Sequence, residues 1–512
     1  MLTHFKGDRA MRLLAFTLVT GLSASALAQF EHTTNNGTIT ITGYHGTGGT
    51  LVIPDRINDR QVTAIADAAF QNKTNLNYMV IPETVTRIGS RAFSGCSWLF
   101  GVEMPSGVQN IADYAFYRCF QLVDITIPEH ATNIGDYAFA DCPSLRDVSI
   151  PDRVKSIGAS AFQSCWRLTS LTIGDGVTSI APEAFVGCRA LESVNIGDGV
   201  TTIWPRAFAN CTNLTNVVIG AGVTNIATGY DRAFEDCSSL SAITVQPDNP
   251  TYSSVAGVLF DKTRRTLVLY PAARIGDYAV PEGVMKIGDY AFESCTALTN
   301  VTLPNSVTNI AGWAFRLCVK LSSILLGENV ISIGEGAFAN CDRLKSIVFP
   351  DSVRDIGPSA FHGCMRLERV IMGRNVAHIG QGAFQICSSL REIFFMGNSP
   401  SLGSYPFFNS FQATVYYLPG TTGWHPTLEG RPTILWDPRM QTPRAGTNGF
   451  GLDITGNTNI VVVVEACSNL ADPVWTPLAT NSLSGGASQF NDPDLRNFPS
   501  RFYRLRPSWA AN

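Results

Sequence analysis

The sequence predicts an α/β-type repeat solenoid, in which coils stack with strands on one face and short turns on the other. The motif Ala-Phe-x-x-Cys recurs every 23 positions, with its Phe running from Phe93 to Phe208 and again from Phe292 to Phe384. Each period also carries apolar residues at fixed places, as at Leu145, Val148 and Ile150. A period in this range indicates coils that bury their apolar side chains only against their neighbours. With 512 residues, the chain is also too long for one compact core.

One unit shows how the elements follow from the residues, counting Leu145 as position 1. Val148 and Ile150, at positions 4 and 6, have the period-two spacing of a half-buried strand. Pro151 has no N–H for a ladder and closes the strand. In the run Ala-Phe-x-x-Cys-x-x-Leu, Phe162 and Cys165 have the i, i+3 spacing of a helical or 3₁₀ turn. Stacked units therefore predict a parallel β-sheet on one face and short helical or 3₁₀ turns on the other.

The full motif, Leu-x-x-Val-x-Ile-Pro-x-x-Val-x-x-Ile-Gly-x-x-Ala-Phe-x-x-Cys, covers roughly residues 76 to 395. It resembles the leucine-rich repeats of the BspA type, which occur in surface and secreted bacterial proteins. The resemblance implies a curved leucine-rich-repeat solenoid used for attachment or protein binding, and it implies no catalytic residues.

Residues 1–28 have the features of a cleavable export signal. Lys6, Arg9 and Arg12 precede a short apolar run, and Ala26-Leu27-Ala28 fits a small-residue cleavage site. The apolar run of about ten residues is shorter than the ~20 that a membrane span needs. We therefore expect a secreted or cell-surface protein without a transmembrane span.

The pattern of apolar residues and turn residues along the chain predicts further divisions. Between Cys237 and Cys295 the period fails, and apolar runs around a polar turn at Asp261 to Arg265 indicate a β-hairpin. After Leu390 the repeat fades, and from Phe450 short β-rich runs alternate with turns. The expected order is an N-terminal cap (29–75), the solenoid (76–395) with a hairpin insertion at about 246–280, a C-terminal cap (396–436), a linker (437–449) and a small β-sandwich-like module (450–512).

Composition and motifs argue against several classes of function. The net charge is −4 and no run of Lys or Arg stands out, so a nucleic-acid partner has no electrostatic support. The histidines are dispersed, and no Cys-x-x-Cys pair or phosphate-binding glycine loop is present. We expect no catalytic, cofactor or metal residues. The Gly-Asp-Gly at 174–176 is interpreted as a turn.

Twelve of the thirteen cysteines occupy the same position of the repeat. In-register neighbours have parallel Cα–Cβ vectors about 4.8 Å apart, whereas a disulfide prefers Cβ atoms ~3.8 Å apart and a twisted approach. We expect a column of buried free thiols that act as small hydrophobic side chains.

The outward-facing position 5 of the repeat gives the candidate binding surface. It is mostly polar in the early units but apolar in the last four, at Leu325, Val348, Ile371 and Phe394. A contiguous apolar stripe of this kind marks an interaction site, unless the C-terminal cap or module folds over it. Both alternatives are open at this point.

These observations predict a non-enzymatic, exported binding or adhesion protein that presents a leucine-rich-repeat surface to a protein partner. One alternative is a structural scaffold of an envelope or matrix. Another is a carbohydrate-binding protein that uses aromatic residues at variable positions, such as Trp98, Phe120 and Trp166.

Overall fold

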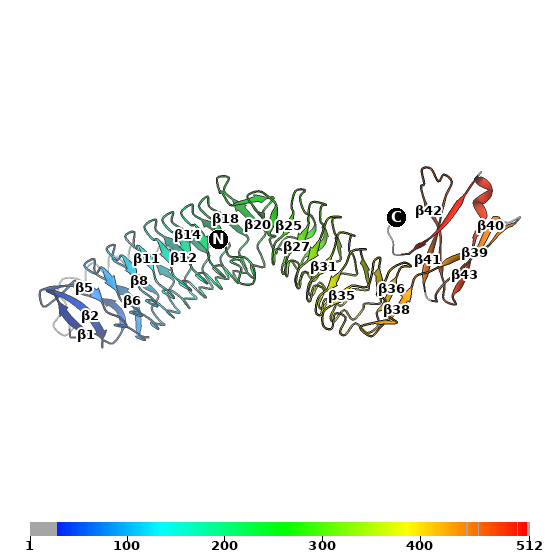
Figure 1. Ribbon diagram of the computed structural model, residues 1–512. Coiled ribbons are helices and arrows are strands. Elements are labelled where there is room, and N and C mark those ends of the chain that lie inside the picture. The colour runs from blue at the N-terminus through cyan, green and yellow to red at the C-terminus, as the bar shows by residue number, and fades with distance from the viewer. Residues whose placement is uncertain (1–27, 447–448, 459, 499, 509–512) are drawn as a thin grey trace, which may run out of the picture. The chain divides into compact units, whose positions relative to one another are not determined.

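The structure is a computed structural model that describes residues 28–446, 449–458, 460–498 and 500–508 (Figure 1). It divides into two compact units, Met1–Arg274 with Asp289–Cys295, and Ile275–Gly288 with Thr296–Asn512. The predicted signal peptide, residues 1–28, lies outside the described residues except for Ala28. Within the described part, no helix has the length and apolar character that crossing a membrane would require.

The first unit begins with strands that lead into the coils. The alternation of Thr and Ile from Thr38 to Thr42 forms a strand in which Ile39 and Ile41 are buried. These strands are β1 (Phe30–Asn35), β2 (Thr38–Tyr44), β3 (Gly49–Val52), β4 (Arg56–Ile57) and β5 (Arg60–Ile65). β1 pairs antiparallel with β2. β2 pairs parallel with β5, and β3 pairs parallel with β6 (Leu76–Val80), so both strands join the stack.

Positions 3 to 6 of successive coils form a parallel sheet, here called the long ladder. Val148 pairs with Leu171 and Ile150 with Ile173, so each partner lies one full repeat further along the chain. Adjacent strands of this ladder lie side by side in Figure 1. In the first unit they are β6 (Leu76–Val80), β8 (Gly101–Glu103), β10 (Asp124–Ile125), β12 (Asp147–Ile150), β14 (Ser170–Ile173), β16 (Ser193–Ile196), β18 (Asn216–Ile219) and β20 (Ala242–Val245).

A second parallel sheet, the short ladder, runs along another side of the same coils. Its two-residue strands end at the buried Ile of position 13, and Asn133 donates from Nδ2 to Asn110 Oδ1 across two of them (2.9 Å). The repeat pattern did not predict this sheet. Its strands are β7 (Arg87–Ile88), β9 (Asn110–Ile111), β11 (Asn133–Ile134), β13 (Ser156–Ile157), β15 (Ser179–Ile180), β17 (Thr202–Ile203) and β19 (Asn225–Ile226).

The predicted helical or 3₁₀ turns are not confirmed, because the Ala-Phe-x-x-Cys segments are successive β-turns. The N–H of Tyr117 bonds to the carbonyl of Tyr114 (3.1 Å), but the N–H of Phe116 bonds to Ala138 in the next coil (2.8 Å). Tyr114 and Arg118 are left-handed, with φ of 57° and 59°. A helix needs consecutive local bonds and right-handed residues. Here alternate N–H groups join the coils instead.

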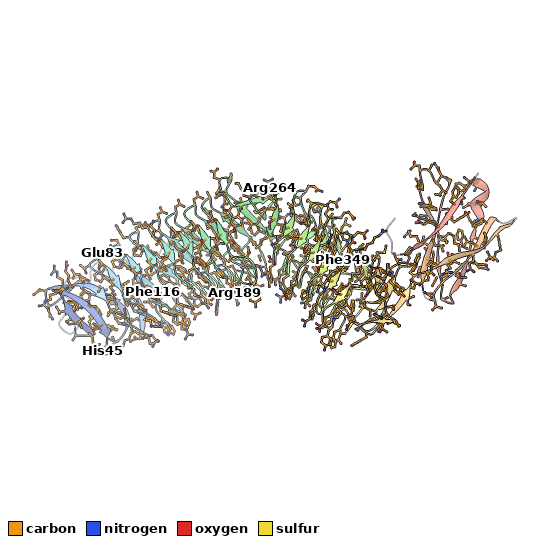
Figure 2. The ribbon with its side chains drawn as sticks, viewed as in Figure 1. His45, Glu83, Phe116, Arg189, Arg264 and Phe349 are labelled. Carbon is orange, nitrogen blue, oxygen red and sulfur yellow. The ribbon has the colours of Figure 1, made fainter. Side chains whose placement is uncertain are left out.

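The core consists of files of like side chains. The rings of Phe116 and Phe139 stack with centroids 5.3 Å apart and planes 2° apart, and Phe139 stacks on Phe162 at 5.1 Å. Phe116 and Phe349 lie inside their coils, whereas Glu83 lies on the outside (Figure 2). Offset aromatic pairs add about 0.5–1.5 kcal/mol beyond their area burial. This repetition explains why the period is so strict.

All thirteen cysteines are free and buried. The Sγ of Cys119 donates to the carbonyl oxygen of Phe93 in the preceding coil (3.2 Å), and the same contact recurs along the column. Burial is the main cause that raises the pKa of the Cys96 and Cys237 thiols, to about 12 in both. The thiols of the column thus act as small hydrophobic side chains that also donate weak hydrogen bonds to backbone carbonyls, as Cys119 does.

The irregular stretch after Cys237 contains an antiparallel meander where the sequence predicts a hairpin. β21 (Tyr252–Val255) pairs with β22 (Val258–Asp261), which pairs with β23 (Thr266–Leu269). Tyr270 then takes the place of the missing Phe: its ring stacks on Phe292 (4.7 Å), and its carbonyl accepts from Cys295 Sγ (3.7 Å). This coil is therefore continuous in the core although its sequence motif is lost.

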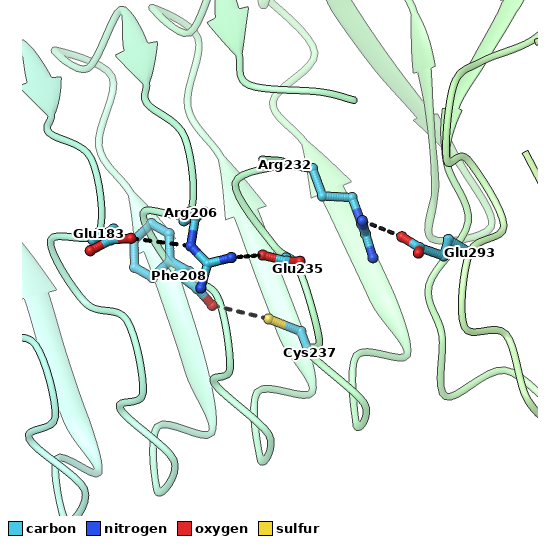
Figure 3. A network of polar contacts seen from close by, with 7 residues as sticks. All are labelled: Glu183, Arg206, Phe208, Arg232, Glu235, Cys237 and Glu293. Atoms are coloured by element: carbon cyan, nitrogen blue, oxygen red, sulfur yellow. Dashed lines mark hydrogen bonds and ion pairs between the residues drawn. The ribbon is translucent and has the colours of Figure 1, made fainter. Parts of the chain in front are cut away.

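Two sets of ion pairs occur close in sequence to the three extra residues near Thr228-Gly229-Tyr230, and Figure 3 shows their side chains. Arg206 pairs with Glu183 (3.2 Å) and with Glu235, and Arg232 pairs with Glu293. The side chains of Arg232 and Glu293 are only 9% and 5% exposed. A buried charge needs such a partner, so the pairing of Arg232 with Glu293 keeps both charges compensated where the period changes.

The second unit repeats the architecture. Its long-ladder strands form two sheets, which are β24 (Gly276–Ala279), β26 (Leu298–Thr302) and β28 (Ser323–Leu325), then β30 (Ser346–Val348), β32 (Arg369–Met372), β34 (Glu392–Phe395), β36 (Thr414–Tyr417), β38 (Arg431–Leu435) and β37 (Thr427–Leu428). Its short-ladder strands are β25 (Lys286–Ile287), β27 (Asn309–Ile310), β29 (Ser332–Ile333), β31 (Asp355–Ile356), β33 (His378–Ile379) and β35 (Ser401–Leu402).

The ring stack and the carbonyl hydrogen bonds of the coils continue into residues 396–436, where the sequence predicts a cap. Phe407 stacks on Phe384 (5.8 Å), and Ser410 stands one full repeat after Cys387. The Ser410 hydroxyl donates to the carbonyl of Phe384 (2.9 Å), which is the bond that a cysteine makes elsewhere. A hydroxyl thus replaces the thiol at the end of the column.

The C-terminal segment forms two three-stranded antiparallel sheets, ordered β39-β40-β43 and β42-β41-β44. Its elements are β39 (Arg439–Gly446), β40 (Gly449–Thr455), β41 (Val461–Cys467), β42 (Thr476–Ser482), β43 (Ala487–Asp492), the 3₁₀ helix η1 (Pro493–Asn497) and β44 (Phe502–Pro507). The predicted sandwich module is not confirmed, because the core of these sheets also includes Phe394, Tyr416 and Trp436 from the preceding coils. The stretch expected as a linker contains β39.

Candidate binding surface

The four predicted surface residues occupy position 5 of four consecutive coils. In a strand, alternate side chains point to opposite faces, so the residues at positions 4 and 6 are buried and position 5 points outward. Leu325 in β28 is 64% exposed and Val348 in β30 is 53% exposed. Aliphatic side chains exposed to this extent, in adjacent coils, form an apolar patch on the long ladder. We call Leu325 and Val348 the open stripe.

The other two residues are covered to different degrees. Phe394 is 3% exposed and stacks on Tyr416 (4.9 Å) within the core that the C-terminal sheets complete. Ile371 is half-buried and packs against the same core. The structure therefore does not present all four side chains as one exposed stripe. Phe394 and, in part, Ile371 are covered within the core that the C-terminal segment completes, as the alternative interpretation of the sequence allowed. Leu325 and Val348 remain exposed.

The open stripe also lies where the long ladder of the second unit divides. β28 ends a three-stranded sheet and β30 begins a six-stranded one. Leu325 and Val348 thus lie in the edge strands of two sheets, although the coils that carry them are joined elsewhere, for instance by the Sγ of Cys364 bonding to the carbonyl of Phe338 (3.1 Å).

Three cations form a column on three consecutive coils, two of which carry the open stripe. Lys320, Arg343 and Arg366 all stand at position 23, and each side chain is exposed. Among the described residues, none of the three has an acidic group within ion-pair distance, in contrast to Arg369, which pairs with Glu392 (2.7 Å). We call these three residues the cation column. A search of the sequence for runs of Lys and Arg does not detect it, because its members lie one full repeat apart.

The aromatic residues that the carbohydrate alternative invokes are on the surface of the first unit. Trp98 is 64% exposed, Phe120 44% and Trp166 52%. The guanidinium of Arg189 lies over the Trp166 ring (5.9 Å), and Figure 2 shows Arg189 at the outside of its coil. These rings are accessible side chains that pack only in part against their own coils.

The described residues contain no group of three or more His, Cys, Asp or Glu that could hold a metal ion. The thiols are also poor nucleophiles, since burial raises the pKa of Cys364 to about 12. The Gly-Asp-Gly at 174–176 is a close-packed turn, because a Cβ on Gly176 would lie 1.6 Å from the carbonyl oxygen of Asp152.

Comparison with protein families gives a match to the BspA type leucine rich repeat region over residues 63–192, 155–266, 270–330 and 314–422. The chain is 33% identical to a leucine rich cell surface protein from Faecalibacterium prausnitzii A2-165, whose crystal structure superposes with a TM-score of 0.52. That match covers 72% of this chain and 94% of the other.

A leucine-rich repeat protein from Bacteroides ovatus ATCC 8483 is 23% identical, with a TM-score of 0.55, and the match covers 80% of this chain and 98% of the other. At that identity the likeness supports the fold alone. Comparison with curated proteins gives no match.

Proposed function

Because this chain belongs to the family of BspA-type leucine-rich repeat proteins, we propose that it is an exported, non-enzymatic protein that holds a protein partner on its repeat surface. The observation that carries the proposal is the open stripe, in which Leu325 and Val348 are both more than half exposed. Exposed apolar patches of this kind mark interaction sites. We place the protein outside the cell or on its surface, since the Faecalibacterium relative is described as a cell surface protein.

The open stripe continues an interface that the molecule already uses. On its far side, Ile371 and Phe394 pack against the C-terminal segment. The same position of the repeat therefore serves as a docking face for a β-rich segment within this chain. A partner that covers Leu325 and Val348 would extend that apolar contact by two coils.

Energetics set the scale of the expected interface. Complete burial of two aliphatic side chains is worth about 3–6 kcal/mol, and association itself costs at least that much. The open stripe is thus an anchor, and a stable complex requires further contacts along the coils. A repeat surface offers such contacts from many side chains.

A double variant, Leu325→Asp with Val348→Asp, tests the proposal. Both side chains are exposed, so the fold should persist, with an unchanged circular dichroism spectrum and thermal midpoint. Immobilised wild type and variant are compared for proteins captured from extracts of the native environment. Thr126→Asp is the matched control, because Thr126 is an exposed position-5 residue of the first unit. Species bound by wild type and control but not by the double variant support the proposal, whereas equal capture by all three contradicts it.

The exposed aromatic residues favour a second candidate, carbohydrate binding by the first unit. Trp98, Phe120 and Trp166 present accessible ring faces on coils of that unit. A glycan array comparing wild type with Trp98→Ala tests it. Strong hits that disappear in this variant, and that persist in the double variant of the open stripe, would place sugar binding on the first unit.

A further inference from the structure

The cation column is an arrangement that the fold alone does not require. Lys320, Arg343 and Arg366 stand in register on consecutive coils, so their Cα atoms are about 4.8 Å apart. Like charges in register are destabilising, and these three have no acidic partner within ion-pair distance among the described residues. Asp342 and Glu368 are close in sequence to the column but form no ion pair with it. The next coil shows that the chain can neutralise a cation, because Arg369 pairs with Glu392.

The column and the open stripe lie on neighbouring coils, because Arg343 shares its coil with Leu325 and Arg366 shares its coil with Val348. Lys320 precedes Leu325 by five residues, and Arg343 precedes Val348 by five. Five residues span at most about 17 Å of extended chain, and the flexible stems of Lys and Arg shorten the gap further. Lys345, which is also exposed, lies between Arg343 and Val348. A segment that covers the stripe therefore also reaches the cations.

The local charge supports the same conclusion. Residues 296–395 contain nine Lys and Arg but seven Asp and Glu, whereas the whole chain has a net charge of −4. This part of the surface is positive on a chain that is negative overall. Complementary charge around an apolar contact increases the association rate and selects the partner.

We infer that the open stripe and the cation column form one docking surface for an acidic protein segment, which carries apolar side chains interleaved with Asp or Glu and lies along the coils. This inference rests on the proposed function and specifies the chemistry of the partner. An anionic polysaccharide would satisfy the cations, but Leu325 and Val348 are aliphatic and offer its hydroxyl groups neither a hydrogen bond nor a ring face. The combination of the two features favours a protein segment.

The experiment measures fluorescence anisotropy with the full chain and defined probes. The main probe is a short fluorescein-labelled peptide of alternating Leu and Asp, and matched peptides carry Ser or Lys in place of Asp. Polygalacturonate serves as the anionic polysaccharide. The charge variant is Arg343→Glu with Arg366→Glu, the stripe variant is the uncharged Leu325→Ser with Val348→Ser, and the control is Arg167→Glu, an exposed residue at position 23 of the first unit.

The expected result is that the Leu/Asp peptide binds wild type and control equally, and about tenfold more weakly to the charge variant. Added salt should weaken binding in the same direction. The stripe variant should also lose binding, and the Ser and Lys peptides should bind weakly or not at all.

Other outcomes separate the inference from the proposed function. Equal binding of the Ser peptide, with no effect of charge reversal, would overturn the acidic partner and leave the apolar docking face intact. Binding of the Leu/Asp peptide that depends on the cations but is unchanged in the stripe variant would overturn both the inference and the proposed role of the open stripe. Binding of polygalacturonate with the same dependence would also overturn both. Absence of binding of the Leu/Asp peptide to wild type would also overturn the inference.

Discussion

The Sγ of Cys142 lies 3.1 Å from the carbonyl oxygen of Phe116, one coil earlier, and donates a hydrogen bond to it. The same carbonyl also accepts the N–H of Cys119 (3.2 Å). The thiol therefore fills a second acceptor site of a buried backbone group and packs as a small hydrophobe. These two roles can be separated by mutation.

Cys142→Ser should cost less stability than Cys142→Ala. The hydroxyl keeps the donor, as Ser410 does at the end of the column, whereas alanine loses the bond and leaves a small cavity. We expect a loss of about 1 kcal/mol for serine and about 2 kcal/mol for alanine, measured by urea unfolding. Equal losses would mean that the sulfur contributes only by packing.

The thiol column should give the fold a dependence on alkaline pH. Burial raises the pKa of Cys96, Cys237 and Cys364 from an ordinary value near 9 to about 12. The unfolded chain releases these protons first, so the contribution of the thiols to the free energy of unfolding should be constant below about pH 9 and fall as the pH rises toward 12. Chemical denaturation at several pH values measures this slope.

A thiol-reactive dye provides an independent check of the same pKa shifts. At pH 8 the native protein should react slowly with the dye, and the unfolded protein should expose all thirteen thiols. Rapid reaction of the native chain would contradict the buried column.

Breaking the buried pair between Arg232 and Glu293 should be strongly destabilising. Glu293→Gln removes the ion-pair partner of the Arg232 guanidinium, whose side chain is only 9% exposed, for an expected loss of about 3–5 kcal/mol. Replacing both residues, as Arg232→Met with Glu293→Leu, should restore most of that loss because no buried charge is left. Thermal unfolding of the two variants gives the comparison, and a double variant as unstable as the single one would contradict it.

Ile386 has φ of 60°, a left-handed conformation that is strained for a β-branched residue. Ile386→Asn should raise the free energy of unfolding by about 1 kcal/mol, because Asn adopts this region readily. Ile386→Val keeps both the β-branch and the strain and is the matched control. Equal effects of the two substitutions, measured by urea unfolding, would show that packing of the side chain outweighs the backbone strain.

The strict repeat was sufficient to predict coils, a long parallel ladder, buried Phe files and free thiols. It did not predict the short ladder, because strands such as Asn110–Ile111 contain only two residues and pair with residues one full repeat away. The i, i+3 spacing of Phe162 and Cys165 was interpreted as a helical turn. Spacing alone does not reveal that alternate N–H groups bond to the next coil and that residues such as Tyr114 are left-handed.

The candidate surface was predictable only in part. Alternation along each strand correctly placed Leu325 and Val348 outside, but the burial of Phe394 depends on where the C-terminal sheets pack. That packing involves Leu452 and Ile454, which are distant in sequence and carry no repeat pattern. The cation column likewise became visible only when coils were aligned.

Tyr270 passes the ring stack from an irregular coil to Phe292 without the usual motif. Tyr270 supplies the ring and the carbonyl that the usual motif would supply, although the segment before it has another length and form. Whole coils can then be gained or lost during evolution, or one coil can acquire an outward insertion, while the packing of the core is kept. The length of the exposed surface and the insertions on it can therefore change without a change in the core.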